Sequence, residues 1–349
     1  MPLLGVLVLA ATWTSKPPGL VLALVAVFLI GAVLSAVHHA ETVAYRVGEP
    51  FGALTLAVAV TVIEVGLIVT LMVTAETDTS TLARDTVFAA VMITCNGIVG
   101  LSLLVGALRT LHAEFSSEAT TTALSTVLTL AALTLVLPEF TTTTPGPEFS
   151  GGQLAFVGVA SIALYALFVF NQTVRHRESF VDEEELVVAA EEQPGRPSAR
   201  EGLRSLLLLL VSLVVVVGLA KVESPAIEDA VDAIGAPQSA VGVLIALLVL
   251  APETVAAVRY ARRDRVQISF NLALGSAMAS IGLTIPVIAV ASIWLEGPLV
   301  LGLEPTQIVM LGLTAIVTAL TIVPGRATLQ EGGVHLVILG AFLFLALFP

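Results

Sequence analysis

The chain has 349 residues, of which 57% are hydrophobic and 12% are charged, and its mean hydropathy is +1.00. A soluble domain carries about 25% charged residues, so these values exclude an ordinary soluble protein. The apolar runs are continuous and do not alternate, which favours membrane helices over a membrane β-barrel. We therefore expect a protein that lies in a lipid bilayer and has no nucleic-acid partner.

Eleven apolar segments predict an all-α polytopic membrane protein with about eleven transmembrane helices of roughly 20 residues. They lie near residues 2–14, 19–36, 49–74, 86–108, 119–137, 152–171, 203–220, 235–258, 266–293, 304–323 and 331–348. The first segment is short. It lacks a basic start and a clear cleavage site, so we interpret it as a leading helix and not as a removed signal peptide.

The longest polar segment, residues 172–202, is acidic and divides the chain. Residues 1–18 form the leading helix and first loop, and residues 19–171 and 203–349 hold five predicted helices each. An odd number of helices in each half places the halves in opposite orientations. Two inverted five-helix repeats are a common plan of transporters, with the binding site near the midplane between the halves.

The basic residues predict the orientation in the membrane. Twelve of the fifteen Lys and Arg residues fall in alternate loops: Arg46, Arg109, Arg175, Arg177, Arg196, Arg200, Arg204, Arg259, Arg262, Arg263, Arg265 and Arg326. By the positive-inside rule these loops are cytoplasmic, which places the N-terminus inside and the C-terminus outside.

Two carboxylates interrupt the apolar runs. Glu64 lies in AVAVTVIEVGLIVTLMV and Glu253 lies in VGVLIALLVLAPETVAAV, each on the second helix of its half. An ionised carboxylate within the bilayer costs at least a few kcal/mol, so such residues usually mark ion or proton pathways. A structural pairing with a basic residue is the alternative, but neither helix core contains one, and Arg259 lies beyond Glu253.

The neighbours of these glutamates offer further oxygens. Thr61 precedes Glu64 by one turn, Thr254 follows Glu253, and Pro252 leaves the Leu248 carbonyl without its helical partner. Hard cations such as Ca²⁺ take several oxygen ligands. Because burial disfavours the charged form of a carboxyl group, the same pair is expected to take protons when no cation is bound. Glu64 and Glu253 are thus the predicted metal-binding and proton-binding residues, and no resident cofactor is expected.

The next helix of each half carries polar and small residues. These are Asn96 in the first half and Asn271, Ser276 and Ser280 in the second, and their oxygens are candidate ligands. Helix packing is the alternative for all four, because small polar residues also line helix contacts. Glu49, near the predicted cytoplasmic end of its helix, is either a vestibule or relay acid or a helix-terminus acid.

The sequence resembles the calcium/proton exchanger family of the cation/Ca²⁺ exchanger superfamily, and specifically its bacterial ChaA-type branch. The matching stretches are HHAETVAYRVGEPFGALTLAVAVTVIEVGLIVTLM, RDTVFAAVMITCNGIVGLSLLVG, LLVLAPETVAAV, RVQISFNLALGSAMASIGLTIPV and PGRATLQEGGVHLVI. The resemblance implies a leading helix with two inverted five-helix repeats, Glu64 and Glu253 as the exchanging carboxylates, and an inner-membrane location. A homo-oligomer is compatible with these features.

The resemblance implies a secondary antiporter that exports Ca²⁺ in exchange for protons. The positions before the glutamates lack the Gly-Asn-Ala signature of the eukaryotic branch, and Ala279 stands where that branch has Gln. An Na⁺ or K⁺/H⁺ antiporter on the same fold is therefore the first alternative, and a cation channel is the second. A primary pump is not expected, because the chain has no GxxxxGK[ST] motif. A membrane enzyme is not expected, because the helix cores hold no metal triad or Ser-based dyad.

Overall fold

A computed structural model of the chain describes residues 1–13, 17–48, 51–75, 77–175, 197–295 and 297–349, and it is almost entirely helical. The first part contains α1 Pro2–Thr12, α2 Gly19–Val47, α3 Phe51–Thr74, α4 Leu82–Met92, η1 Ile93–Ile98, α5 Val99–Thr110, β1 Ala113–Glu114, α6 Ser117–Ala131, η2 Ala132–Val136, α7 Leu137–Phe140, α8 Gly151–Phe170 and η3 Asn171–Arg175. The second part contains α11 Ala199–Ala233, α12 Ser239–Ala261, α13 Val266–Ala279, η4 Ser280–Thr284, α14 Ile285–Ala291, α15 Pro305–Ile322, β2 Arg326–Ala327 and α16 Leu329–Leu347.

The predicted fold class is confirmed. Within the described residues, ten helices are long and apolar enough to cross a membrane. The leading helix α1 has 11 residues, a length of about 16 Å, and is too short to cross the bilayer alone. It begins beside Gly31, midway along α2, and packs against α11.

Several helices extend beyond the apolar runs that predicted them. Helix α2 was expected to end near residue 36 but continues to Val47, and α11 runs from Ala199 to Ala233 where 203–220 was expected. The added turns are polar but contain good helix formers, so the backbone stays helical after the apolar run ends. Hydropathy therefore located the helices correctly but placed some of their ends short.

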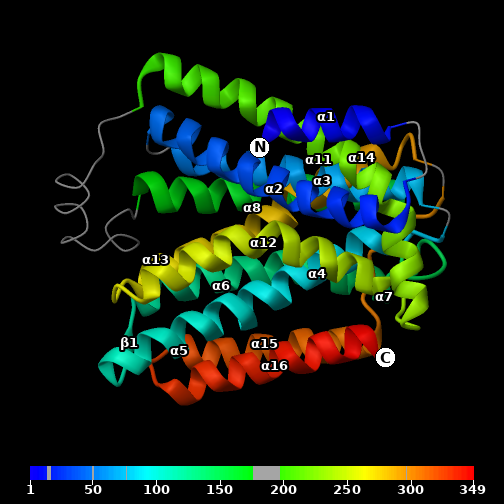
Figure 1. The fold of residues 1–349 in the computed structure, drawn as a ribbon. Helices are drawn as coiled ribbons and strands as arrows, with labels where there is room; N and C mark the ends of the chain where they lie inside the picture. The colour runs from blue at the N-terminus through cyan, green and yellow to red at the C-terminus, as the bar shows by residue number, and fades with distance from the viewer. Residues whose placement is uncertain (14–16, 49–50, 76, 176–196, 296) are drawn as a thin grey trace.

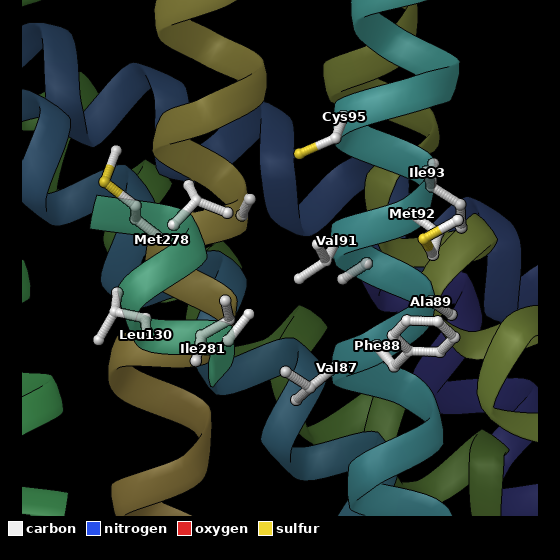
Figure 2. Close-up of a cluster of buried hydrophobic side chains, with 14 of the residues drawn as sticks. Val87, Phe88, Ala89, Val91, Met92, Ile93, Cys95, Leu130, Met278 and Ile281 are labelled. Carbon is white, nitrogen blue, oxygen red and sulfur yellow. The ribbon is translucent and has the colours of Figure 1, made fainter. Parts of the chain in front are cut away.

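Two composite helices form the centre of the bundle. One combines α4, η1 and α5, and the other combines α13, η4 and α14; 89% and 67% of their apolar windows are buried. Figure 2 shows Val87 and Val91 of the first composite helix on the side that faces Leu130 of α6 and Met278 of α13, with Phe88 and Met92 on its other side. Each composite helix contains a single π-helical segment, η1 or η4, and such segments occur frequently at functional sites.

The outer helices expose apolar faces. Leu20, Leu24 and Val27 of α2 are exposed, as are Leu203, Leu207, Leu210 and Val214 of α11. These residues recur at intervals of three or four and form apolar stripes. Exposed stripes of this kind fit contact with lipid, since a soluble protein rarely leaves so much apolar surface uncovered.

The bundle has two ends, which Figure 1 shows on the left and right. We call the left end the arginine face; there α2 and α12 end, α11 and α13 begin, and Arg46, Arg204 and Arg262 lie. A two-residue antiparallel ladder, β1 with β2, pairs Ala113 with Ala327 at this end. The C-terminus lies at the opposite face. Most of the acidic linker falls in residues 176–196, outside the described part of the chain.

Candidate functional site

A cavity of about 930 Å³ lies between the two halves of the chain. Its walls come from α2, α3, α4, α8, η3, α12, α13 and η4. It extends from Glu64 and Ser280, deep in the bundle, to Tyr45, Gln172 and Tyr260 near the arginine face. Glu253 also lines it, so the two carboxylates predicted from separate halves share one cavity.

Glu64 is held by two hydroxyl groups from the opposite half. Its side chain is buried, with 3% of its surface exposed. Ser280 Oγ donates to Glu64 Oε1 at 2.6 Å, and Thr284 Oγ1 donates to Glu64 Oε2 at 3.2 Å. Both donors belong to or border the π-helical turn η4, which faces α3. Charge-assisted hydrogen bonds of this type stabilise an ionised carboxylate.

Glu253 has a different environment. It is 8% exposed, and its Oε2 atom is buried without a hydrogen-bond partner among the described residues. Helix α12 remains continuous through Pro252. A buried carboxylate oxygen without a partner costs free energy unless a proton or a cation satisfies it. Glu253 therefore lines the cavity and keeps one carboxylate oxygen that the described residues do not satisfy.

Three further predicted residues lie on the cavity wall. Thr61 is buried one turn before Glu64, and Ser276 lies one turn before Ser280. Asn271 lines the cavity nearer the arginine face, and its Oδ1 accepts a hydrogen bond of 2.8 Å from Gln267 Nε2. The structure thus brings Thr61, Ser276, Ser280 and Asn271 together with the two glutamates.

The structure places the other predicted residues elsewhere. Thr254 donates its hydroxyl hydrogen to the backbone carbonyl of Leu250 at 2.7 Å and does not line the cavity. Leu248 packs in the apolar cluster that α2, α3, α11 and α12 form, and it does not line the cavity. Glu49 lies outside the described residues.

Asn96 belongs to a separate buried polar network. Its Nδ2 donates to Thr314 Oγ1 at 3.0 Å and to the Met92 carbonyl at 3.2 Å, and its Oδ1 lies 3.3 Å from His335 Nδ1. The other ring nitrogen of His335 lies 3.2 Å from Thr321 Oγ1. This network joins η1 to α15 and α16. The side chain of Asn96 therefore points away from the glutamates that it was expected to assist.

Comparison with known proteins identifies the family. The family model described as sodium/calcium exchanger protein matches residues 18–174 and 204–348. The chain belongs to the sodium/calcium exchanger protein family. The resemblance to ChaA-type antiporters is confirmed as well, because this family member is 33% identical to the sodium-potassium/proton antiporter ChaA of Escherichia coli (strain K12), over 98% of its own length and 93% of ChaA.

Other relatives extend the same conclusion. The exchanger-family chain is 44% identical to y4hA of Sinorhizobium fredii (strain NBRC 101917 / NGR234), provisionally described as an ionic transporter, over 100% of its own length and 95% of y4hA. It shares its fold with native YfkE at a TM-score of 0.73 and 16% identity, covering 99% of this chain and 100% of YfkE. The H⁺/Ca²⁺ exchanger CAX matches at a TM-score of 0.66 and 17% identity, covering 94% and 85% of the two chains. The protein is therefore a multi-pass membrane protein of a transporter family.

Two residues of this exchanger-family site were missed in the sequence. Thr284 follows Ser280 by four residues, so the helical spacing alone was a usable signal for a second donor on the same face. Glu41 lines the cavity from α2. It lies beyond residue 36, where hydropathy placed the end of that helix, and was not considered as a site residue.

The cavity is largely apolar but offers a small set of oxygen atoms to an ion. Within the described part of the chain, no three His, Cys, Asp or Glu side chains are grouped closely enough to hold a metal ion. The site instead offers two buried carboxylates and a few hydroxyl groups on several helices. Such a ligand set can bind a cation or protons and can separate when the helices move.

Proposed function

We propose that this protein is a secondary cation/proton antiporter in which Glu64 and Glu253 bind a cation and protons in turn. The observation that carries the proposal is the shared cavity: two buried carboxylates from different halves line it, and one of their oxygens has no hydrogen-bond partner among the described residues. Family membership and the antiporter names of the relatives support the same class of activity.

Electrostatics supplies the coupling in this mechanism. An empty site with two ionised carboxylates would be costly to enclose in a low-dielectric protein interior. A bound cation neutralises the pair, and so do protons taken up after the cation leaves. The transport cycle therefore reorients only with the site loaded, and the cation and protons move in opposite directions.

The conformation described here corresponds to an inward-facing state in this proposal. The cavity extends from Glu64 toward the arginine face. By the positive-inside rule this face is cytoplasmic, which places the C-terminus outside. Cations would enter from the cytoplasm, and the protein would lie in the inner membrane.

Ca²⁺ is the first candidate for the exported cation. Two carboxylates match the charge of one divalent ion, and Ca²⁺ accepts irregular shells of oxygen ligands. The fold is shared with proteins named Ca²⁺/H⁺ antiporter YfkE and H⁺/Ca²⁺ exchanger CAX. The proposed reaction is export of Ca²⁺ with entry of protons and requires no resident cofactor.

Na⁺ or K⁺ is the second candidate, and one observation favours it. The neutral groups bonded to the glutamates are hydroxyls, whereas the amide of Asn96 is engaged by Thr314 and His335. A site with few amide oxygens suits Na⁺ or K⁺, because a monovalent ion needs fewer strong oxygen ligands than Ca²⁺ does. The relative ChaA is named a sodium-potassium/proton antiporter.

Purified protein in liposomes with an imposed pH gradient tests the proposal. Ca²⁺, Na⁺ and K⁺ are each added, and proton movement is followed with a pH-sensitive dye. We expect exchange with at least one cation, and we expect Glu64→Gln and Glu253→Gln to abolish it while the protein remains monodisperse in detergent. Glu223→Gln is the matched control, since Glu223 is a buried carboxylate of α11 outside the cavity.

Three outcomes would contradict the mechanism. One is full exchange by either glutamine variant of the cavity pair. Another is cation flux that does not respond to the pH gradient, which would indicate a channel. The third is loss of exchange in Glu223→Gln to the same degree as in the cavity variants. This result would show that the effect is not specific to the glutamates of the cavity.

A further inference from the structure

A third carboxylate lines the cavity. Glu41 lies on α2, and Thr42 and Tyr45 of the same helix line the cavity beside it. Glu41 is only partly buried, in contrast to Glu64 and Glu253. It is six residues from the end of α2, or about 9 Å from the arginine face along the helix axis. Glu41 therefore lies between the mouth of the cavity and its deep end.

Glu41 and Glu253 line the same cavity from two helices that contact each other, α2 and α12. Glu253 is eight residues from the end of α12, or about 12 Å, and α12 ends at the same face as α2. Glu41, Glu64 and Glu253 all line the same cavity. By these helix-axis estimates Glu41 lies about 3 Å nearer the arginine face than Glu253, on a wall of the cavity that a cation enters from this face.

Glu41 makes no close ion pair with the part of the chain that the structure describes. The charged groups that face it are His38, one turn earlier on α2, and Arg259 of α12. Within the described residues, Arg84 makes the ion pairs shorter than 4.0 Å, with Asp85 and Glu304, and Glu41 makes none. Tyr45 and Tyr260 complete the polar surroundings. Within the described residues Glu41 therefore has no close ion-pair partner, and Arg259 acts on it only from beyond 4.0 Å.

We infer that Glu41 is a cation-collecting residue: it draws the hydrated cation into the cavity and holds it transiently before the cation reaches Glu253. This inference rests on the proposed antiport function. A cleft with low-dielectric walls and charges of one sign concentrates counter-ions. Because Glu41 is more exposed than the deep pair, it is able to interact with a cation that still keeps part of its hydration shell.

The role of Glu41 differs from that of the deep glutamates. Glu64 and Glu253 must exchange cation for protons, so their loss stops transport. Glu41 raises the local cation concentration, so its loss weakens the apparent affinity and leaves the maximal rate intact. An electrostatic effect of this kind also decreases with ionic strength, because the Debye length falls from about 30 Å at 0.01 M to about 8 Å at 0.15 M.

The test compares Glu41→Gln with the wild type in the liposome assay at about 0.01 M and about 0.15 M ionic strength. We expect KM for the transported cation to rise about three- to tenfold at low ionic strength, with kcat within about twofold of the wild type, and the difference to shrink at high ionic strength. Glu41→Asp keeps the charge and should stay near the wild type. Glu118→Gln is the matched control, because it removes an exposed carboxylate from the arginine-face end of α6, outside the cavity.

Calorimetric titration of the detergent-solubilised protein with the same cation separates this inference from the proposed function. Weaker binding by Glu41→Gln supports the inference even if the wild type shows no proton-coupled transport. An unchanged KM and Kd in Glu41→Gln would overturn it, and so would an effect that persists unchanged at high ionic strength. Complete loss of exchange at saturating cation would also overturn it, because Glu41 would then belong to the exchanging set.

Discussion

Ser280 donates a 2.6 Å hydrogen bond to Glu64, and this contact joins a π-helical turn of the second half to the central carboxylate of the first. The corresponding turn η1 of the first half makes no such contact with Glu253 among the described residues, since the side chain of Asn96 turns toward α15 and α16. The two glutamates are thus equivalent in sequence position but not in environment. Glu64 is already satisfied by protein donors, whereas Glu253 retains a vacant oxygen.

The first prediction concerns the donor to Glu64. Ser280→Ala removes the 2.6 Å bond, and a hydrogen bond to a charged group contributes about 1.5–3 kcal/mol. Because the hydroxyl favours the ionised carboxylate that binds the cation, we expect the apparent cation affinity to fall about tenfold or more. Ser280→Thr keeps the hydroxyl group and should lose less. Ser269→Ala is the control, because Ser269 is a buried serine of α13 whose hydroxyl donates to the Ala257 carbonyl outside the cavity, and an equal loss of affinity in this control would argue against a specific role for the Ser280 bond.

The second prediction distinguishes a structural role for Asn96 from a ligand role. Asn96→Ala removes the buried amide that bonds Thr314 Oγ1 and His335 Nδ1, although Thr321 still contacts the other ring nitrogen of His335, and a buried polar group that loses its partner costs about 1–3 kcal/mol. We expect a lower Tm of the detergent-solubilised protein and an unchanged KM for the cation in the folded fraction. Asn271→Ala, the amide that does line the cavity, should affect KM more than Tm. A raised KM with an unchanged Tm in Asn96→Ala would return Asn96 to the ligand set.

These residues show how far the sequence carries. Glu64 and Glu253 were predictable because a charge within an apolar run is conspicuous. The direction of Asn96 was not, because it depends on where the π-helical turn η1 lies, and no composition signal marks such a turn. Glu41 was missed for another reason: the turns of α2 beyond residue 36 are polar, so hydropathy ended the helix before reaching it. The presence of each helix could be predicted from the sequence. The direction of its side chains and the positions of its ends could not, because they depend on how the helices pack together.

The third prediction concerns the direction in which the cavity opens. Cys95 is the one cysteine of the chain and is fully buried. A thiol reagent will therefore label only a cysteine that is introduced at an accessible position. Gly275→Cys places a thiol on the cavity wall, where an added Cβ meets no atom within 4 Å. We expect a membrane-impermeant maleimide to label it from the cytoplasmic side.

Asp78→Cys provides the matched control, because Asp78 is exposed in the loop between α3 and α4, at the face opposite the arginine face. It should be labelled only from outside. Labelling of both positions from the same side would contradict the assigned opening, and the reverse pattern would invert the orientation drawn from the arginine residues.

The fourth prediction tests the closest approach of two helices. A Cβ on Gly332 of α16 would lie 2.7 Å from the backbone nitrogen of Leu104 and 3.0 Å from the carbonyl oxygen of Gly100. The backbone of α5 cannot give way as a side chain can, so Gly332→Ala must separate α5 from α16 and strain the His335 network nearby. Overpacking of this kind typically costs about 1–3 kcal/mol.

Gly333→Ala is the adjacent control, since its Cβ would meet no atom within 4 Å and alanine favours the helix by about 0.5–1 kcal/mol. We therefore expect Gly332→Ala to lower Tm and Gly333→Ala to keep or raise it. Equal Tm values for the two variants would contradict the close approach of α5 and α16 at Gly332.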